Sequence, residues 1–152
     1  MSMVQETVEV DVPLHTAYNQ WTQFEDFPRF MDGVERVTQI DERHNHWHTK
    51  ISGVSREFDT EIVDQLPDQR IAWRTTGGDV QQKGVVSFAR LDDDRCEVRL
   101  AMDYDPQGMA EHAADTIGMI DRRVRGDLER FKSFIEERGL ESGGWRGRIR
   151  PS

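Results

Sequence analysis

The sequence is poor in cysteine and in long apolar segments. Cys96 is the only cysteine among 152 residues, so an intrachain disulfide is excluded and a reducing compartment is favoured. The aspartates at 92–94 are expected to raise the pKa of its thiol, which disfavours a nucleophilic role. No apolar stretch has the length of a membrane span, and the acidic N-terminal segment lacks the apolar centre of a signal peptide. We therefore expect a soluble cytoplasmic protein without integral membrane association.

Positive charge is also scarce. The chain has 20 lysines and arginines against 29 acidic residues, which leaves a formal net charge of −9. Contacts with phosphates need clustered positive charge, so no binding to nucleic acid is expected. The exception is the C-terminal end, where Arg146, Arg148 and Arg150 lie around Trp145. We interpret residues 141–152 as a flexible basic tail, and contact of this tail with an anionic partner is the alternative.

The sequence also lacks a catalytic or cofactor motif. It contains neither a serine- or cysteine-based nucleophile arrangement nor a glycine-rich phosphate loop, and we expect no cofactor. His44, His46 and His48 alternate along one predicted strand, and imidazoles two residues apart can bind Zn²⁺. The pattern places no cysteine or fourth histidine to complete the ligand set, and Lys50 would add positive charge to the same face. A solvated strand face is the preferred interpretation, and no metal site is predicted.

A long series of strands is what the sequence does contain. Apolar and polar residues alternate over 4–10, which predicts a first strand. Pro13 favours the start of a short helix, and a second helical turn around Pro28 ends at Gly33. The period of two then continues and predicts six strands, at 34–42, 45–52, 55–65, 70–76, 82–91 and 95–104. Their short connections predict antiparallel neighbours.

The last predicted element is a long amphipathic helix over residues 106–138. Its apolar residues recur at spacings of three and four from Met109 to Ile135, which places them on one face. Asp105 is a candidate cap, and Gly139 provides a stop. So long an apolar face needs a broad apolar surface, and one face of the antiparallel sheet is the candidate. A helix pressed into a curved sheet can enclose a ligand cavity.

Several segments carry a family resemblance. They are Val12-Pro13, the run from Trp21 to Met31, Ile71-Ala72-Trp73, Gly84 to Phe88, Tyr104-Asp105-Pro106, and Gly126 to Lys132. With them the chain resembles the polyketide cyclase/dehydrase branch of the START-like (SRPBCC) helix-grip superfamily, which includes coenzyme Q-binding START-like proteins. The resemblance implies an α+β helix-grip fold over residues 1–140. In that fold a seven-stranded antiparallel curved sheet surrounds a long C-terminal helix, in the order β-α-α-β6-α.

The resemblance also implies a cavity that holds an apolar or polycyclic ligand. The candidate ligand-binding residues are Trp47, Phe58, Trp73, Met102, Tyr104, Ile117, Asp121 and Val124. Trp73 offers a flat stacking surface, and Tyr104 offers a hydroxyl that can orient a carbonyl group. An ordinary packed core is the alternative role for the large aromatic side chains.

Asp121 is the candidate for acid–base chemistry at the edge of the helix stripe. A carboxylate in an apolar cavity has a raised pKa and can move a proton during cyclisation or dehydration. An ion pair with Arg125, one helical turn further on, is the interpretation that we favour. No residue is therefore assigned as catalytic.

The aromatic run from Trp21 to Met31 is the strongest local signature. Its apolar members are expected to seal one end of the space between sheet and helix, with Pro28 fixing the turn between them. A structural plug is the preferred role, and a gate to the cavity is the alternative.

The leading function is binding of a small hydrophobic molecule, such as a lipid, a quinone or a polyketide-like compound. One alternative is a polyketide aromatase/cyclase-dehydratase, and another is a structural or stress-related protein whose own side chains fill the cavity. The family includes both enzymes and carriers, so the resemblance does not choose between them. A cavity would favour binding, and a buried ionisable group inside it would favour the enzyme. The sequence does not determine the oligomeric state.

Overall fold

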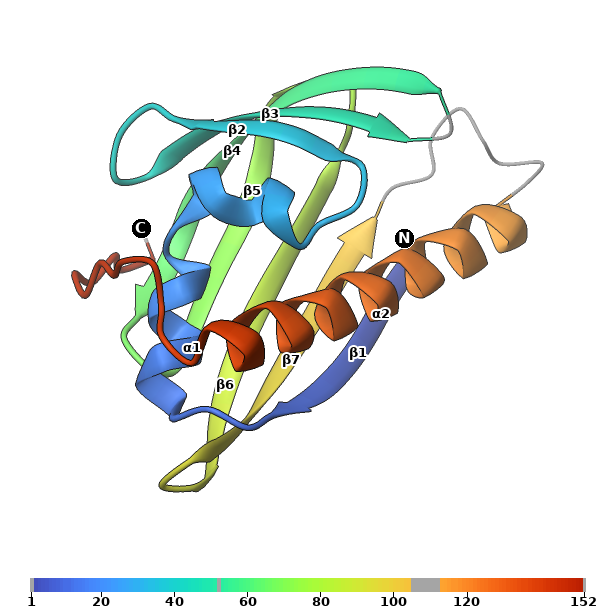
Figure 1. Cartoon of the computed structure of the whole chain (residues 1–152). Helices are drawn as coiled ribbons and strands as arrows, with labels where there is room; N and C mark the ends of the chain where they lie inside the picture. Colours follow the sequence, from blue (N-terminus) through green and yellow to red (C-terminus); the bar gives the residue numbers. More distant parts are fainter. Residues whose placement is uncertain (1, 52, 105–112, 152) are drawn as a thin grey trace.

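The computed structural model describes residues 2–51, 53–104 and 113–151, in which seven strands form one antiparallel sheet (Figure 1). The elements are β1 (Ser2–Val10), α1 (Leu14–Trp21), η1 (Phe24–Arg29), β2 (Val34–Gln39), β3 (His44–Ile51), β4 (Val54–Leu66), β5 (Arg70–Gly78), β6 (Gln82–Asp92), β7 (Arg95–Tyr104) and α2 (Ala113–Arg138). The second short helix, η1, is a 3₁₀ helix. The predicted α+β helix-grip fold and the order of its elements are confirmed.

The strand order of the sheet is β1-β7-β6-β5-β4-β3-β2. Strands β2 to β7 follow one another through short connections, as the turn residues predict. The first strand is the exception, because it pairs with the last one: Val8 lies opposite Val98 and Val10 opposite Cys96. The chain therefore crosses from one edge of the sheet to the other through α1 and η1, which places these helices over the concave face.

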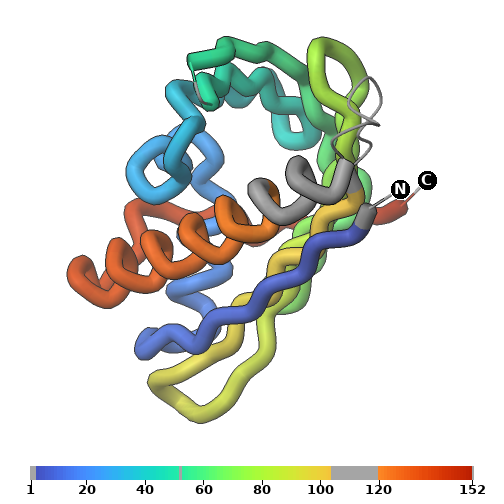
Figure 2. The backbone as a smooth tube through the Cα atoms, turned by 90° about the vertical axis from the view of Figure 1, so that its right-hand side faces the viewer, coloured from blue at the N-terminus to red at the C-terminus, as the bar shows by residue number. Residues whose placement is uncertain are grey.

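Helix α2 lies inside the curve of the sheet. Figure 2 shows β2, β3 and β4 on one side of this helix and β1 and β7 on the other. The predicted stripe faces inward, since Val124, Leu128, Phe131 and Ile135 are all at most 4% exposed. The predicted start of the helix at Asp105 and Pro106 lies outside the described residues. No helix in the described part of the chain has both the length and the apolar character needed to cross a membrane.

An aromatic cluster joins the three helices into one core. The ring of Trp21 lies 5.3 Å from Phe27, 5.8 Å from Phe30 and 5.3 Å from Phe131, measured between ring centroids. The rings meet at steep or tilted angles, an arrangement that aromatic pairs prefer over face-to-face stacking. The run that begins at Trp21 is thus fixed to α2 through Phe131.

The C-terminal segment packs against the domain, which departs from the predicted flexible tail at 141–152. Ile149 is 2% exposed and exchanges two backbone hydrogen bonds with Gln65 of β4, at 2.8 and 3.0 Å. Arg146 pairs with Asp68 at 2.7 Å and lies over the ring of Tyr18. In Figure 1 the segment runs beside α1. The contacts of this segment are with residues about 80 to 130 positions away in sequence, so they leave no local pattern. For that reason the composition predicted a solvated end.

Candidate functional site

A cavity of about 370 Å³ lies between the concave face of the sheet and α2. Its floor is formed by apolar residues of the central strands, and Ile62, Ile71, Val86 and Leu100 are all at most 4% exposed. Val124 of α2 contributes the opposite wall. The side chains of the described residues therefore leave an open space inside the protein. In the purely structural alternative, the protein's own side chains would fill this space.

One end of the cavity is lined by the aromatic run predicted to act as a plug. Trp21, Phe24 and Phe27 all line the space and are at most 6% exposed. Phe27 also lies 5.7 Å from Trp47, between ring centroids, so that η1 contacts β3 directly. This end of the cavity is deep, because all of these ring systems belong to the packed core.

The wall formed by β3 and β4 carries a stacked aromatic pair. Trp47 lies opposite Phe58 in the strand register, and their rings are nearly parallel, at 5° and 5.9 Å between centroids. The indole nitrogen of Trp47 donates a hydrogen bond to Thr60 Oγ1 at 2.8 Å. That bond fixes the rotamer of the indole and leaves a flat apolar surface along the cavity.

A second tryptophan lines the cavity from β5. Trp73 lies opposite Gly84 of β6, and its indole covers that glycine. A Cβ atom on Gly84 would lie 2.6 Å from Trp73 Cζ2, so any larger residue would push the ring away. Glycine at this position therefore sets where the indole lies.

Charged residues gather where the cavity meets the surface. Asp32, Arg56, Arg123 and Asp127 all belong to its lining. Arg123 donates a hydrogen bond from Nη1 to the backbone oxygen of Asp32 at 3.0 Å, and the backbone N–H of Asp32 donates to Asp127 Oδ1 at 3.1 Å. Burial raises the pKa of Asp127, although an ion pair with Arg130 acts in the opposite direction. Asp127 is thus an acid of raised pKa at the cavity wall.

Five of the eight predicted ligand-binding residues lie on the cavity wall. They are Trp47, Phe58, Trp73, Met102 and Val124. The side chains of Tyr104 and Ile117 lie outside the described residues. A role of these residues in binding stays a prediction.

The structure places Asp121 at the surface of α2, away from the cavity lining. Its carboxylate lies 3.4 Å from Arg125, which is the predicted ion pair, and Arg125 also pairs with Glu6 of β1 at 3.2 Å. The neighbouring Glu6 carboxylate raises the pKa of Asp121, while Arg125 lowers the pKa of Glu6. This arrangement ties α2 to the edge strand β1.

Asn45, Arg56 and Asp127 are among the cavity residues that were not singled out from the sequence. Asn45 has the same strand parity as Trp47, and Arg56 has the same parity as Phe58, so the period of two was a usable signal for both. For Asp127 the spacing gave no such signal, because its contacts with Asp32 and with the cavity depend on how α2 docks.

Cys96 is fully buried in β7, at 0% exposure. Burial raises the pKa of its thiol to about 11, so the thiolate is scarce at neutral pH. The predicted inertness agrees with this position, but its cause is loss of solvent rather than the nearby aspartates.

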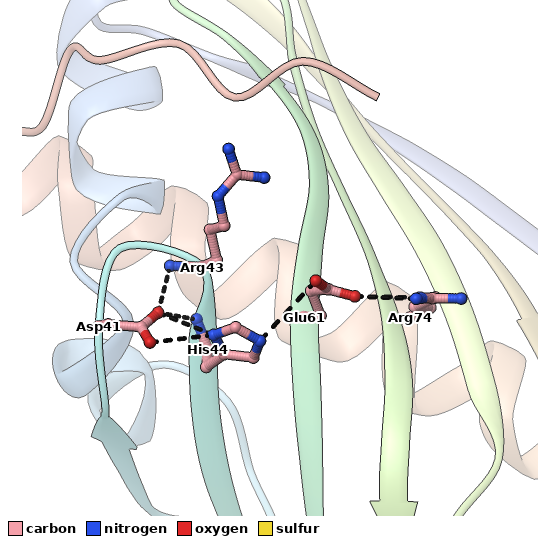
Figure 3. A network of polar contacts seen from close by, with 5 residues as sticks. All are labelled: Asp41, Arg43, His44, Glu61 and Arg74. Carbon is pink, nitrogen blue, oxygen red and sulfur yellow. Dashed lines mark hydrogen bonds and ion pairs between the residues drawn. The ribbon is translucent and has the colours of Figure 1, made fainter. Parts of the chain in front are cut away.

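The three histidines of β3 lie on the outer face of the sheet, among carboxylates. His44 contacts Asp41 at 2.8 Å and Glu61 at 3.8 Å, and Glu61 also pairs with Arg74, as Figure 3 shows. Among the described residues no group of three or more histidine, cysteine or acidic side chains has an arrangement that could hold a metal ion. Each histidine is instead bound by its own acidic partners on this face.

His46 is expected to titrate above its ordinary value. Hydrogen bonds with Asp59 at 2.7 Å and Glu57 at 3.1 Å raise the pKa of His46 above 6.5. A raised pKa in the folded state adds stability that is fully present below pH 6.5 and is lost as the pH rises through the folded pKa. NMR titration of the imidazole protons measures the pKa directly. In His46→Gln this part of the pH dependence of unfolding disappears, and a pKa at or below the ordinary value in the parent would contradict the prediction.

Comparisons with known proteins agree with this geometry. A family model described as "Polyketide cyclase / dehydrase and lipid transport" matches residues 10–132. A protein of Streptomyces lincolnensis, described as an uncharacterized 17.2 kDa protein in the melC2-rnhH intergenic region, is 57% identical over 149 residues, which cover 98% of this chain and 99% of that protein.

Solved structures share the fold at low sequence identity. An aromatase/cyclase from Streptomyces sp. R1128 has a TM-score of 0.78 at 18% identity, covering 95% of this chain and 99% of that one. A START superfamily protein from Mycobacterium smegmatis has a TM-score of 0.67 at 20% identity, with coverages of 84% and 97%. At such identities these two likenesses concern the fold alone.

Proposed function

Because this chain belongs to the polyketide cyclase/dehydrase and lipid transport family, we propose that its cavity binds a small hydrophobic molecule, such as a lipid, a quinone or a polyketide-like compound. The observation that carries the proposal is a cavity of about 370 Å³ with mostly apolar walls. Pockets for small molecules are typically about 300–1,000 Å³ and combine apolar walls with a few polar groups. Transfer of an apolar ligand into such a space removes its surface from water, which is the main driving force for binding.

Flat ligands suit the walls better than branched ones. The Trp47–Phe58 pair and Trp73 bring aromatic rings to the cavity wall from β3, β4 and β5. Stacking on the faces of such rings is favourable beyond the burial of area alone. A conjugated or ring-containing molecule is therefore the preferred occupant.

A cyclase or dehydratase is the second candidate, and Asp127 is the observation that favours it. Its carboxyl lies at the cavity wall with a raised pKa and beside Arg130. A carboxyl group of raised pKa is a stronger base than an ordinary aspartate and keeps its proton to a higher pH, and enolisation and loss of water both need proton transfer. The hydrogen bond that Asp127 accepts from the backbone of Asp32 also gives it a structural task.

Native mass spectrometry of protein purified from its own host tests the proposed function. A co-purifying small molecule would support binding and would give the ligand class from its mass. Incubation of the recovered molecule with fresh protein, followed by chromatography and mass spectrometry, then separates the two candidates, because dehydration gives a product lighter by one water and cyclisation alone gives an isomer with a different retention time. A carrier returns the molecule unchanged.

Trp73→Ala is expected to lower affinity for a neutral fluorescent probe, anthracenemethanol, by about tenfold or more, because it removes a stacking surface. Only a modest fall in melting temperature should accompany it, since Trp73 is half-buried and faces open space. Trp145→Ala is the matched control, because Trp145 packs against the core outside the cavity lining. Unchanged probe affinity together with a large loss of stability in Trp73→Ala would assign Trp73 to the core.

A further inference from the structure

Polar and apolar pairs alternate along the cavity face of β3 and β4. The register places Asn45 opposite Thr60, Trp47 opposite Phe58, Thr49 opposite Arg56, and Ile51 opposite Val54, and all eight residues line the cavity. The stacked aromatic pair is thus flanked on both sides by hydrogen-bonding side chains. Purely hydrophobic ligands would gain nothing from these two polar bands.

Arg56 is a cation in this wall with no carboxylate partner among the described residues. Its side chain is half-buried, and no acidic group of the described residues lies within ion-pairing distance of its guanidinium. The acidic residues next to it on β4, Glu57 and Asp59, have the opposite strand parity and bind His46 on the outer face. A partly desolvated guanidinium is stabilised by an anionic oxygen, which a ligand in the cavity can supply.

Two buried polar atoms are left unpaired at the deep end. Asn45 is 1% exposed and Trp21 is 2% exposed. Within the described part of the protein, neither Asn45 Oδ1 nor Trp21 Nε1 has a hydrogen-bond partner, and both residues line the cavity. Buried polar atoms are almost always paired, because an unpaired one loses its hydration without compensation. An acceptor on β3 and a donor on α1 that line the same cavity match a ligand hydroxyl group, which can donate to the first and accept from the second.

The residues along β3 and β4 are exposed at one end of the cavity and buried at the other. Val54 is 50% exposed and marks the mouth, Arg56 follows it along β4, and Asn45 lies at the buried end. Thr49, which faces Arg56, is four residues from Asn45, and four residues of a strand span about 13 Å. The cationic and the amide groups are therefore separated by roughly the length of a molecule with two or three fused rings.

We propose that the cavity selects an elongated amphipathic acid in one orientation, an inference that rests on the proposed function. Its acidic oxygen, as a carboxylate, phenolate or enolate, pairs with Arg56 at the mouth. Its flat apolar body lies against Trp47 and Phe58. A hydroxyl group at the far end donates to Asn45 Oδ1 and accepts from Trp21 Nε1. Arg56 is then the residue that sets specificity for an acid over a neutral hydrophobic molecule of the same shape.

A matched pair of fluorescent anthracenes tests the mouth: anthracenecarboxylic acid and anthracenemethanol. The parent protein is expected to bind the acid about 10- to 100-fold more tightly than the alcohol, as for a charge-assisted hydrogen bond. In Arg56→Met the affinity for the acid falls by the same factor, while the affinity for the alcohol stays within about twofold. Arg74→Met is the control, because it removes the same charge from an arginine that pairs with Glu61 on the outer face (Figure 3) and leaves both affinities unchanged.

Three results would overturn the proposal. Equal binding of acid and alcohol by the parent would mean that the cavity takes neutral hydrophobic molecules, and the proposed function would stand without the acid. Equal losses for both probes in Arg56→Met would make Arg56 a structural residue. Binding of neither probe to the parent would remove the proposed function as well, so the two failures are distinguishable. The parent comparison decides even if a variant fails to fold.

The deep end has its own test, with naphthoic acid and a hydroxynaphthoic acid that carries its hydroxyl at the opposite end. The parent is expected to bind the hydroxylated acid about fivefold to tenfold more tightly, because the hydroxyl pairs the two buried atoms. In Asn45→Leu this preference disappears, while the melting temperature stays the same or rises, since an unpaired buried amide has been removed. A preference that persists in this variant would exclude Asn45 from the ligand site.

Discussion

Replacing Phe131 by alanine is expected to lower the free energy of unfolding by about 3–5 kcal/mol. Phe131 is 0% exposed and contacts Trp21 and Phe30, at 5.3 and 5.2 Å between ring centroids. Through Phe131, α2 therefore packs against both α1 and the residue that follows η1. Truncation leaves a void among rigid aromatic rings, which collapse poorly around it. Urea denaturation followed by circular dichroism measures the change.

Phe134→Ala on the same helix is the control for that experiment. Phe134 is only half-buried, contacts Phe30 at 5.5 Å and lies under the guanidinium of Arg138. Its removal exposes less apolar area and creates no enclosed void, so the expected loss is clearly smaller. If both variants lost the same stability, the aromatic cluster would not be the main attachment of α2.

Gly78→Ala is expected to lower the free energy of unfolding by about 2–4 kcal/mol. Gly78 has a φ of +103°, a backbone conformation that residues with a side chain rarely adopt. A Cβ atom there would lie 2.4 Å from the Cα of Phe58 and 2.5 Å from the backbone oxygen of Glu57. Backbone atoms cannot move aside as the end of a flexible side chain does, so β4 and β5 must separate at this point.

Gly77→Ala provides the matched comparison from the adjacent position. A Cβ atom on Gly77 would meet nothing closer than Asp59 Oδ2, at 4.0 Å, so this variant is expected to be nearly as stable as the parent. Gly78→Ala should also weaken binding of anthracenemethanol, because Phe58 carries one ring of the stacked pair. Equal stabilities of the two variants would show that the strands tolerate the shift, and would contradict the prediction.

Alternation along the chain was sufficient to predict the sheet. Each of the six later strands was placed within about three residues of its observed ends, because apolar and polar residues alternate and short turns separate them. The partner of β1 was not given by this pattern. Its pairing with β7 follows from the crossing made by α1 and η1, which no local pattern in the sequence indicates.

The cavity wall was predictable in part. The parity that places Trp47 and Phe58 inward applies equally to the polar residues Asn45 and Arg56. Whether a polar side chain on the inward face of the sheet finds a hydrogen-bond partner depends on which residues of the other elements lie next to it. A single sequence does not contain that information.

Long-range docking explains what the sequence could not predict. Ile149 forms its bridge with Gln65, and Asp127 accepts a hydrogen bond from Asp32, at separations that leave no local pattern. The same limit applies to Asp121, whose local partner Arg125 was predicted while its distant neighbour Glu6 was not.

The pairing of β1 with β7 has a consequence for synthesis in the cell. Residues 2–10 leave the ribosome long before their partners at 96–104, and α2, which packs on β1, comes later still. Until then the opening strand has no neighbour, and contacts so distant along the chain slow folding. The nascent protein therefore carries an uncovered β-edge through most of translation, and it is in this interval that chaperones have the most to protect.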